Sequence, residues 1–364
     1  MRSSNFSKNE RIHKVQAALK EQRAELCLIT NPVDLYYLTG LNLSSGKLLV
    51  HPRLALLFVD GRYIQIAEEK SAVPAVLDEA DALLRFCERT EAKKIIFDPK
   101  ATSFLQYQQF KMQIEGFQKK GRRRLSLIPD QELFQRMRLI KDAGELKALQ
   151  RSAALLWKGY QHILRILKPG ITEKDVAREF EIYCLQEGAE KLAFDPIIAF
   201  GPNSAMPHYR AGKAKWKKNQ IVLIDIGVVL NQYHSDMTRT ILPANCNPFL
   251  QKMYDTVLQA QRAALKMCRP GVKIGQLDLA ARKVMKCMKL EPFFLHSLGH
   301  GIGLETHEFP RIRAVGADSD VQLEEGMVIT VEPGLYVAGK GGVRYEDTIA
   351  ITKNGYVNFS PRSG

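Results

Sequence analysis

Residues 220–242 read QIVLIDIGVVLNQYHSDMTRTIL and contain two strand-like apolar runs, residues 220–229 and 233–242. The short stretch between the runs suits a tight reversal, so we expect an antiparallel hairpin. One acid lies within each run, Asp225 in the first and Asp236 in the second. Burying a carboxylate in an apolar strand is costly unless a partner neutralises it, which makes both acids candidates for a functional site.

The chain after about residue 143 shows one plan of helices and strands twice. In the first copy, a long helix is predicted over residues 143–167, and a second helix begins after Thr172, which stands at capping-box distance from Asp175. The hairpin follows. The second copy is predicted to hold helices over residues 248–268 and from there to about 288, then strands near Phe293, over 327–331 and over 343–351.

The two copies are also related in sequence. Leu-Lys-Pro-Gly-Ile at residues 167–171 returns as Cys-Arg-Pro-Gly-Val at residues 268–272, and each stretch separates two predicted helices. We therefore expect two similar αα-ββ halves that face each other. A cleft between their sheets is a common place for a site.

The chain before residue 128 alternates in another way. Ile12, Val15 and Leu19 have the spacing of one helix face. Short apolar runs occupy residues 25–30, 47–50, 54–59 and 94–97. This alternation indicates an α/β domain. We expect one domain over residues 1–128 and a second over residues 129–364.

Length and composition exclude several classes of protein. A chain of 364 residues is long enough for two to three domains. Hydrophobic residues make up 45% and charged residues 25%, which excludes collagen-like, low-complexity and wholly disordered proteins. No window approaches the roughly 18 apolar residues of a membrane span, and the opening residues, MRSSNFSKNERIHK, lack the apolar core of a signal peptide. We expect a folded cytoplasmic protein without a membrane partner.

Charge and cysteine usage exclude further classes. The six cysteines are scattered without a C-x-x-C pair, so we predict reduced thiols and neither a disulfide scaffold nor a zinc knuckle. The net charge is +14. The densest basic cluster, residues 119–124, has no interleaved aromatic residues, and we interpret it as a solvated linker rather than a patch that binds polyanions. No specific nucleic-acid partner is expected, and the segment receives no assigned role.

Two more acids occupy strand positions in the second half. Glu332 lies in VITVEPG and Glu346 in GVRYEDT, which repeats the arrangement of Asp225 and Asp236. Each acid alone could be a strand-end residue paired with Arg or Lys. Four of them in two similar halves favour a common site instead.

Three histidines, His296, His300 and His307, lie in the glycine-rich stretch HSLGHGIGLETH. Its glycines disfavour a helix and the H-E-x-x-H pattern is absent, so we predict an extended segment. Four carboxylates balance two divalent cations, and this oxygen-rich set suits Mn²⁺, Co²⁺ or Fe²⁺. Two such ions about 3.5–4 Å apart can hold a bridging water, lower its pKa and stabilise a tetrahedral intermediate, which indicates hydrolase chemistry.

These residues resemble those of the pita-bread metallopeptidases, a family that includes methionine aminopeptidase, aminopeptidase P, Xaa-Pro dipeptidase and creatinase. The stretches NPVDLYYLTG at residues 31–40 and LFVDGRY at residues 57–63 are similar to the creatinase-type N-terminal domain. The resemblance covers nearly the whole chain. It implies an α+β fold in which a pita-bread catalytic domain of two pseudo-symmetric halves follows a creatinase-type α/β domain.

The resemblance also implies roles for the metal ligands. Asp225 would bind one metal ion, His300 and Glu332 would bind the other, and Asp236 and Glu346 would bridge both. Glu332 would also take the proton from the attacking water. All five ligands of the family pattern are present.

Three histidines would contact the substrate by the same resemblance. His208 stands 17 residues before Asp225, where the family places a histidine that hydrogen-bonds the substrate carbonyl or the developing oxyanion. His307 would contact the substrate similarly. His296 would line the pocket for the residue after the cleaved bond.

The residues around Glu346 indicate the branch of the family. Arg344 two positions before it and Asp347 after it resemble aminopeptidase P and prolidase rather than methionine aminopeptidase. An Xaa-Pro bond lacks an amide N–H and carries a fixed ring, so it requires a dedicated pocket. His296 and Arg344 are the candidates for that pocket. Arg344 could instead form an ion pair with Asp236 or Asp347, and both roles can coexist.

The sequence thus predicts a dinuclear Xaa-Pro aminopeptidase, which releases the residue before proline by attack of a metal-bridging hydroxide. The alternative within the family is an Xaa-Pro dipeptidase. A catalytically inactive binding protein of the same fold is disfavoured, because all five ligands are retained. The expected metal is Mn²⁺, with Co²⁺, Fe²⁺ or Zn²⁺ as alternatives. The expected partners are peptides with Xaa-Pro N-termini and further copies of the chain in a homodimer or higher oligomer.

Overall fold

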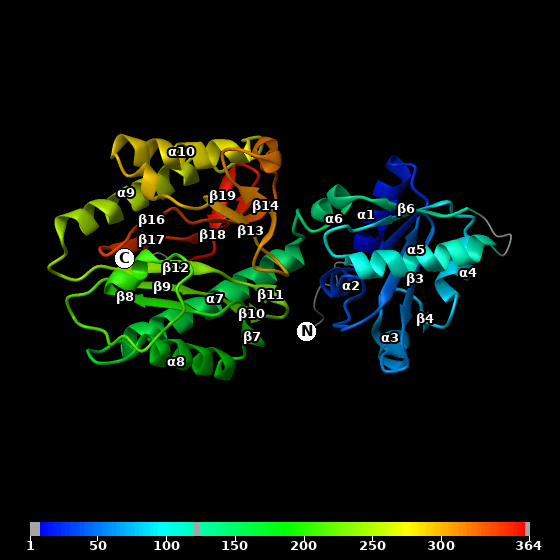
Figure 1. The fold of residues 1–364 in the computed structure, drawn as a ribbon, viewed down its shortest axis with the longest axis horizontal. Coiled ribbons are helices and arrows are strands. Elements are labelled where there is room, and N and C mark those ends of the chain that lie inside the picture. The colour runs from blue at the N-terminus through cyan, green and yellow to red at the C-terminus, as the bar shows by residue number, and fades with distance from the viewer. Residues whose placement is uncertain (1–7, 120–123, 361–364) are drawn as a thin grey trace. The chain divides into compact units, whose positions relative to one another are not determined.

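The computed structural model describes residues 8–119 and 124–360, so most of the basic cluster of residues 119–124 lies outside the described residues. The chain divides into two compact units, Met1–Arg138 and Leu139–Gly364 (Figure 1). None of the helices in the described ranges combines the length and apolar character that a membrane span requires. All six cysteines are described and free.

The first unit is an α/β domain, as predicted. Its mixed sheet has the strand order β4-β3-β2-β1-β5-β6. Ile12, Val15 and Leu19 are buried and form the inner face of the first helix, as their spacing predicts. The strands are β1 Leu26–Ile29, β2 Lys47–His51, β3 Leu54–Val59, β4 Ala75–Leu77, β5 Lys94–Phe97 and β6 Ser126–Pro129. The helices are α1 Lys8–Glu21, α2 Pro32–Thr39, α3 Ile64–Lys70, α4 Ala82–Arg89, α5 Phe104–Lys119 and α6 Gln131–Met137.

The second unit contains two helix pairs on either side of its strands (Figure 1). The first pair is α7 Ala143–Ile166 with α8 Glu173–Gln186, and the second is α9 Pro248–Leu265 with α10 Ile274–Cys287. Thr172 caps α8 and accepts a hydrogen bond from the amide of Asp175, as predicted. Each helix pair covers its own apolar core, so the predicted division into two halves is confirmed.

The strands of the second unit form several short sheets. The first half has the order β12-β9-β8, with β11-β10-β7 beside it, and the second half has the order β14-β13-β15-β18-β19. The pair β16-β17 is a separate ribbon. The first-half strands are β7 Lys191–Leu192, β8 Ile197–Phe200, β9 Val222–Ile226, β10 Val228–Leu230, β11 Tyr233–His234 and β12 Met237–Ile241. The second-half strands are β13 Gly299–Gly301, β14 Glu308–Ile312, β15 Val328–Val331, β16 Gly334–Val337, β17 Gly341–Arg344, β18 Asp347–Thr352 and β19 Gly355–Asn358.

The predicted hairpin is present, but it passes through two sheets. Asn231 and Gln232 have φ of 51° and 67° and form the two-residue reversal between β10 and β11. Farther from the turn, β9 pairs with β12. The break between the two sheets falls at Gly227, where a Cβ atom would collide with the carbonyl oxygen of Ser235. Only glycine fits there, because the crossing backbone approaches so closely.

Two predicted strands in the second half differ from the structure. The segment near Phe293 is a 3₁₀ turn, Glu291–Phe293, because Pro292 has no N–H to donate to a strand ladder. The run over residues 343–351 is divided between β17 and β18. The chain leaves one sheet and enters another at Tyr345 and Glu346, which separate these strands.

Candidate metal centre

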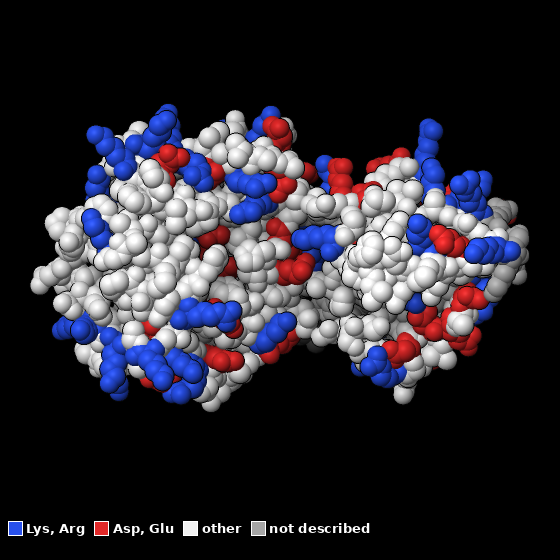
Figure 2. Space-filling model, in the orientation of Figure 1, with Lys and Arg blue, Asp and Glu red and all other residues white. Residues whose placement is uncertain are grey.

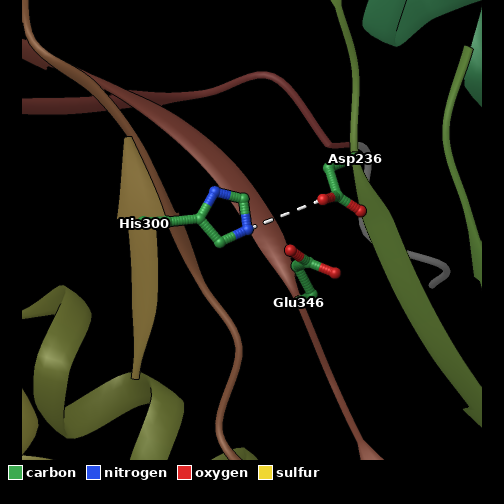
Figure 3. Close-up of side chains that lie close together, drawn as sticks. All are labelled: Asp236, His300 and Glu346. Atoms are coloured by element: carbon green, nitrogen blue, oxygen red, sulfur yellow. Dashed lines mark ion pairs between the residues drawn. The ribbon is translucent and has the colours of Figure 1, made fainter. Parts of the chain in front are cut away.

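Five segments of the second unit carry the predicted metal ligands. Asp225 lies within β9, Asp236 directly precedes β12, His300 lies in β13, Glu332 directly follows β15 and Glu346 directly precedes β18. Asp236, His300 and Glu346 each offer a ligand atom, and these atoms lie within 4.8 Å of one another (Figure 3). Strand ends and strand interiors thus place acids from both halves at one point.

The imidazole of His300 presents a lone pair to these acids. Its Nδ1 lies 3.0 Å from the carbonyl oxygen of Gly301, so the ring donates there and its Nε2 carries no proton. Burial, followed by the charge of His307, lowers the pKa of His300 to about 3, which keeps the ring neutral. Its Nε2 lies 3.4 Å from Glu332 Oε1 and 3.7 Å from Asp236 Oδ2. An unprotonated nitrogen thus faces two carboxylates.

The carboxylates themselves are crowded. Burial, followed by the charge of Glu346, raises the pKa of both Asp236 and Glu332 well above their ordinary values. Burial, followed by the charge of Asp225, raises the pKa of Glu346 to about 8. Negative charge is therefore in excess at this point, and a cation between the groups would relieve it.

The donor set fits divalent metal ions. Within the described ranges, the buried oxygens Asp225 Oδ1, Asp236 Oδ1 and Glu346 Oε1 have no hydrogen-bond partner. Buried polar atoms are almost always satisfied, so three such oxygens require an explanation. Oxygens together with an unprotonated imidazole are the ligands that Mn²⁺, Fe²⁺, Co²⁺ and Zn²⁺ accept. The backbone carbonyl behind His300 is the outer-shell partner that metal-binding histidines usually have.

Arg344 is buried beside this cluster, and its ion pair corrects the sequence prediction. Its guanidinium pairs with Asp225, not with Asp236 or Asp347. The reason is register: Thr238 lies opposite Asp225 across β9 and β12, and Arg344 Nε donates to Thr238 Oγ1 at 3.1 Å. Asp347 is bound instead by Arg239 at 2.9 Å, since successive residues of β12 point to opposite faces.

Thr238 and Tyr336 belong to the site but were not predicted from the sequence. Thr238 Oγ1 donates to Glu346 Oε2 at 2.7 Å, while the Tyr336 hydroxyl accepts from Arg344. The signal for Thr238 was its position two residues after Asp236 in the same predicted strand, a spacing that places both side chains on one face. Tyr336 had no local signal, because it reaches the site only through the ribbon β16-β17.

His296 lies in an aromatic environment next to the metal centre. Its Nδ1 lies 2.8 Å from the carbonyl oxygen of Ser297 and its Nε2 lies 2.9 Å from the Tyr336 hydroxyl. The rings of Phe294 and Tyr336 lie 5.1 Å and 5.5 Å from the His296 ring. Arg282 also binds the main-chain oxygen of His296 at 2.9 Å. Burial, followed by the Arg344 charge, lowers the pKa of His296 to about 4, so this ring is neutral.

His307 and His208 are both exposed to solvent. The His307 ring lies 4.3 Å from the His300 ring. Besides burial, the charge of His208 lowers the pKa of both His296 and His307. The loop before His208 touches the site directly, because the carbonyl oxygen of Pro207 accepts from Arg344 Nη1 at 3.4 Å.

Two known protein families match the two units of the chain. A model of metallopeptidase family M24 matches residues 147–353, more than half of the chain, and a model of the creatinase/prolidase N-terminal domain matches residues 11–140. The chain belongs to metallopeptidase family M24. This membership confirms the predicted metallopeptidase class and the pita-bread fold with its creatinase-type N-terminal domain.

Several M24 relatives resemble the chain over nearly its full length. An Xaa-Pro dipeptidase from Pyrococcus furiosus is 35% identical over 349 residues, which cover 95% of this chain and 96% of the relative. The crystal structure of the prolidase from Pyrococcus horikoshii has a TM-score of 0.89 at 31% identity and covers 98% of this chain and 99% of that one. A structure of an Xaa-Pro dipeptidase from Bacillus anthracis has a TM-score of 0.91 at 30% identity and covers 98% of both chains.

Proposed function

We propose that this M24 metallopeptidase is an Xaa-Pro dipeptidase, which hydrolyses the bond between an N-terminal residue and a C-terminal proline. The observation that carries the hydrolase chemistry is the unprotonated Nε2 of His300 facing the carboxylates of Glu332 and Asp236. The similarity to Xaa-Pro dipeptidases supports the dipeptide substrate. The Xaa-Pro aminopeptidase activity that the sequence predicts becomes the second candidate, since Arg344 and Asp347 around Glu346 fit it equally well.

The proposed metal ligands divide the site between two ions. Asp225 would hold one ion, His300 and Glu332 the other, and Asp236 and Glu346 both. Two divalent cations, of which Mn²⁺ is our first choice before Co²⁺, Fe²⁺ and Zn²⁺, would supply Lewis acidity that polarises the scissile carbonyl and lowers the pKa of a water molecule. The three buried oxygens without a hydrogen-bond partner support metal binding by Asp225, Asp236 and Glu346.

Glu332 is the proposed proton carrier. Its side chain is 16% exposed, more than the 9% of His300 and the 6% of Asp236, so it can reach both solvent and substrate. It would take a proton from the attacking water while the water oxygen bonds to the carbonyl carbon. It would then give that proton to the proline nitrogen as the C–N bond breaks, which completes the hydrolysis.

The surrounding histidines are proposed to bind the substrate. His208 and His307 would donate to the carbonyl oxygen, whose negative charge grows in the transition state. His296 and Arg344 would border the proline pocket. The aromatic rings of Phe294 and Tyr336 next to His296 support this assignment, because a proline ring packs well on apolar and aromatic surfaces.

The test is product release by the Mn²⁺-loaded protein from an Xaa-Pro dipeptide, a matched Xaa-Pro-Yaa-Zaa tetrapeptide and an Xaa-Ala control. The proposal predicts cleavage of the dipeptide alone. Cleavage of the tetrapeptide at its Xaa-Pro bond would establish the aminopeptidase instead. Inactivity on both proline substrates with every candidate metal would reject both activities and favour a binding protein of this fold.

A further inference from the structure

One buried carboxylate lies outside the metal centre and has no part in the chemistry above. Glu173 is the first residue of α8, and none of its surface is exposed. A helix N-terminus favours a negative charge, yet full burial would cost several kcal/mol without compensating hydrogen bonds. No ion pair of Glu173 occurs among the described residues. Its compensation comes from neutral donors.

Four donors from one loop bind this carboxylate. Oε1 accepts from the Phe200 amide at 2.7 Å and from Asn203 Nδ2 at 2.9 Å. Oε2 accepts from the Tyr209 hydroxyl at 2.7 Å and from the Gly212 amide at 3.1 Å. Hydrogen bonds to a charged acceptor are about twice as strong as neutral ones. Glu173 therefore fixes both ends and the interior of residues 200–212.

This loop carries His208. The His208 side chain is exposed, and no hydrogen bond holds it within the part of the chain that the structure describes. Its neighbours determine its position: Tyr209 binds Glu173, and Pro207 accepts from Arg344. A displaced Tyr209 would move His208 directly, because the two residues are adjacent in the backbone.

The other half of the unit shows that the helix itself does not require an acid at this position. Ile274 is the first residue of α10 and is also fully buried. The two positions make the same main-chain contact, since the Glu173 amide donates to Ala214 and the Ile274 amide donates to Val321. An apolar residue thus suffices for the scaffold, and the carboxylate of Glu173 serves the loop.

We propose that Glu173 is a positioning residue that holds the loop of residues 200–212 so that His208 faces the metal centre. The inference rests on the proposed function, in which His208 contacts the substrate carbonyl. Burial, followed by the nearby Glu173 carboxylate, raises the pKa of Tyr209 to about 12, so its hydroxyl remains a donor over the range in which the enzyme is assayed.

The first experiment is a double-mutant cycle between Glu173→Gln and His208→Ala. The carboxamide that replaces the carboxylate has one accepting oxygen instead of two, so the amides of Phe200 and Gly212 cannot both keep their acceptor and the loop shifts. We expect kcat/KM for an Xaa-Pro substrate to fall about 10- to 100-fold in the single Glu173 variant. In the His208→Ala background, we expect Glu173→Gln to lower kcat/KM by less than about 2-fold. A loss of the same size in both backgrounds would overturn the inference, because Glu173 would then not act through His208.

The control and the fallback variant separate positioning from general stability. Glu181→Gln makes the same chemical change on the exposed side of α8 and should leave kcat/KM unchanged. If Glu173→Gln does not fold, Tyr209→Phe removes one of the four donors only, and we expect about a 3-fold loss that again disappears without His208. Equal losses with and without His208 would overturn the inference here too.

A second readout does not depend on activity. Amide hydrogen exchange in residues 200–212 should speed up in Glu173→Gln, while residues 302–312 of the other half should keep their rates. Unchanged exchange in residues 200–212 would contradict the inference even if the enzyme cleaves another substrate. An inactive wild-type protein whose loop is protected would count against the proposed function alone.

Discussion

The two halves of the second unit share one scaffold but hold the loops that carry His208 and His307 by different means. In the second half, the segment after β13 becomes β14 and pairs with β13, so its backbone groups are satisfied by a strand ladder. In the first half, the segment after β8 is a 3₁₀ turn and an irregular loop. Its amides at residues 200 and 212 find their acceptor in Glu173 instead. The carboxylate of Glu173 thus accepts backbone hydrogen bonds that a neighbouring strand would otherwise accept.

The halves also differ in how they present their acids. Met237 pairs with Ile226 in the first half, and Asp347 pairs with Val331 in the second. Asp236 directly precedes Met237, and Glu346 directly precedes Asp347. Asp236 and Glu346 therefore occupy equivalent positions in the two halves. Asp225 and Glu332 do not occupy equivalent positions, since Asp225 precedes Ile226 and Glu332 follows Val331. The two-fold relation is kept for the acids proposed to bridge the metals and lost for the others.

The largest effect is expected from the two equivalent acids. Asp236→Ala and Glu346→Ala should each lower metal-dependent hydrolysis at least about 1,000-fold, because each removes a proposed ligand of both ions. Circular dichroism should show an intact fold, and Glu181→Ala on the surface of α8 is the matched control. Undiminished activity in either variant would contradict the shared centre, and unequal losses would show that the halves do not contribute alike.

A buried ion pair between Lys141 and Glu308 of the second half provides the next test. Lys141 binds Glu308 at 3.0 Å, with 1% and 5% of their side chains exposed, and Glu308 also accepts from the amides of Leu304 and Glu305. Lys141→Met should lower the free energy of unfolding by about 3–5 kcal/mol, because it removes the cation of a buried ion pair. Lys158→Met, which removes the exposed pair with Glu187, should change it little. Equal denaturation midpoints for both variants would contradict the larger effect expected for the buried ion pair.

The crowded carboxylates predict a pH dependence for the metal-free protein. The pKa of Glu346 is raised from 4.5 to about 8, so the folded state binds a proton that the unfolded state has lost. The contribution of Glu346 to the free energy of unfolding should therefore be most favourable below pH 4.5, and it should become less favourable as the pH rises to about 8. Asp236 and Glu332 act in the same direction.

Thermal unfolding of the chelator-treated protein checks this prediction. The melting temperature should be lower at about pH 8.5 than at about pH 6, and added Mn²⁺ should remove most of that difference and release protons. A metal-free protein that is more stable at the higher pH would contradict the proposed crowding. Retention of the pH dependence with saturating metal would show that the ions bind elsewhere.

The smallest effects are expected from two equivalent threonines. Thr238 Oγ1 donates to the Glu346 carboxylate at 2.7 Å, whereas Thr348 Oγ1 donates to the main-chain oxygen of Asp236 at 2.9 Å. Thr238→Val should lower kcat/KM about 10-fold, because it removes a bond to a charged group. Thr348→Val should lower it about 3-fold or less. A larger loss in Thr348→Val than in Thr238→Val would mean that the hydrogen bond from Thr238 does not support Glu346 in this way.

Much of the fold could be predicted because its signals are local. The Pro-Gly pairs at 169–170 and 270–271 mark where each long helix ends, and Thr172 marks where the next begins. The apolar runs mark the strands. Strand breaks such as Gly227 were missed, because they depend on a contact with the backbone of Ser235 that only the folded chain creates.

The candidate site was predictable for a similar reason: acids inside apolar strands are conspicuous, whereas their partners are not. The ion pair of Arg344 joins residues 119 positions apart, and no sequence pattern indicates which of several acids it meets. Glu173 was missed because an acid in the first turn of a helix is ordinary. Its four donors lie 27 to 39 positions farther along the chain.

Charged side chains are present on both units of the chain. On the face shown in Figure 2, Lys and Arg lie on both units in separate groups, with white surface between the groups at the upper left and the lower left. Binding to nucleic acid is expected to be weak and to fall steeply with salt.

The most direct test of the central claim is the number of Mn²⁺ ions that one chain binds at equilibrium dialysis, measured on the wild-type protein and on Asp236→Ala. The two halves are proposed to build one dinuclear centre from equivalent acids. We predict two ions per wild-type chain, with weaker binding of both in the variant. A chain that binds no ion, or a variant that binds two ions as tightly as the wild type, would contradict the account.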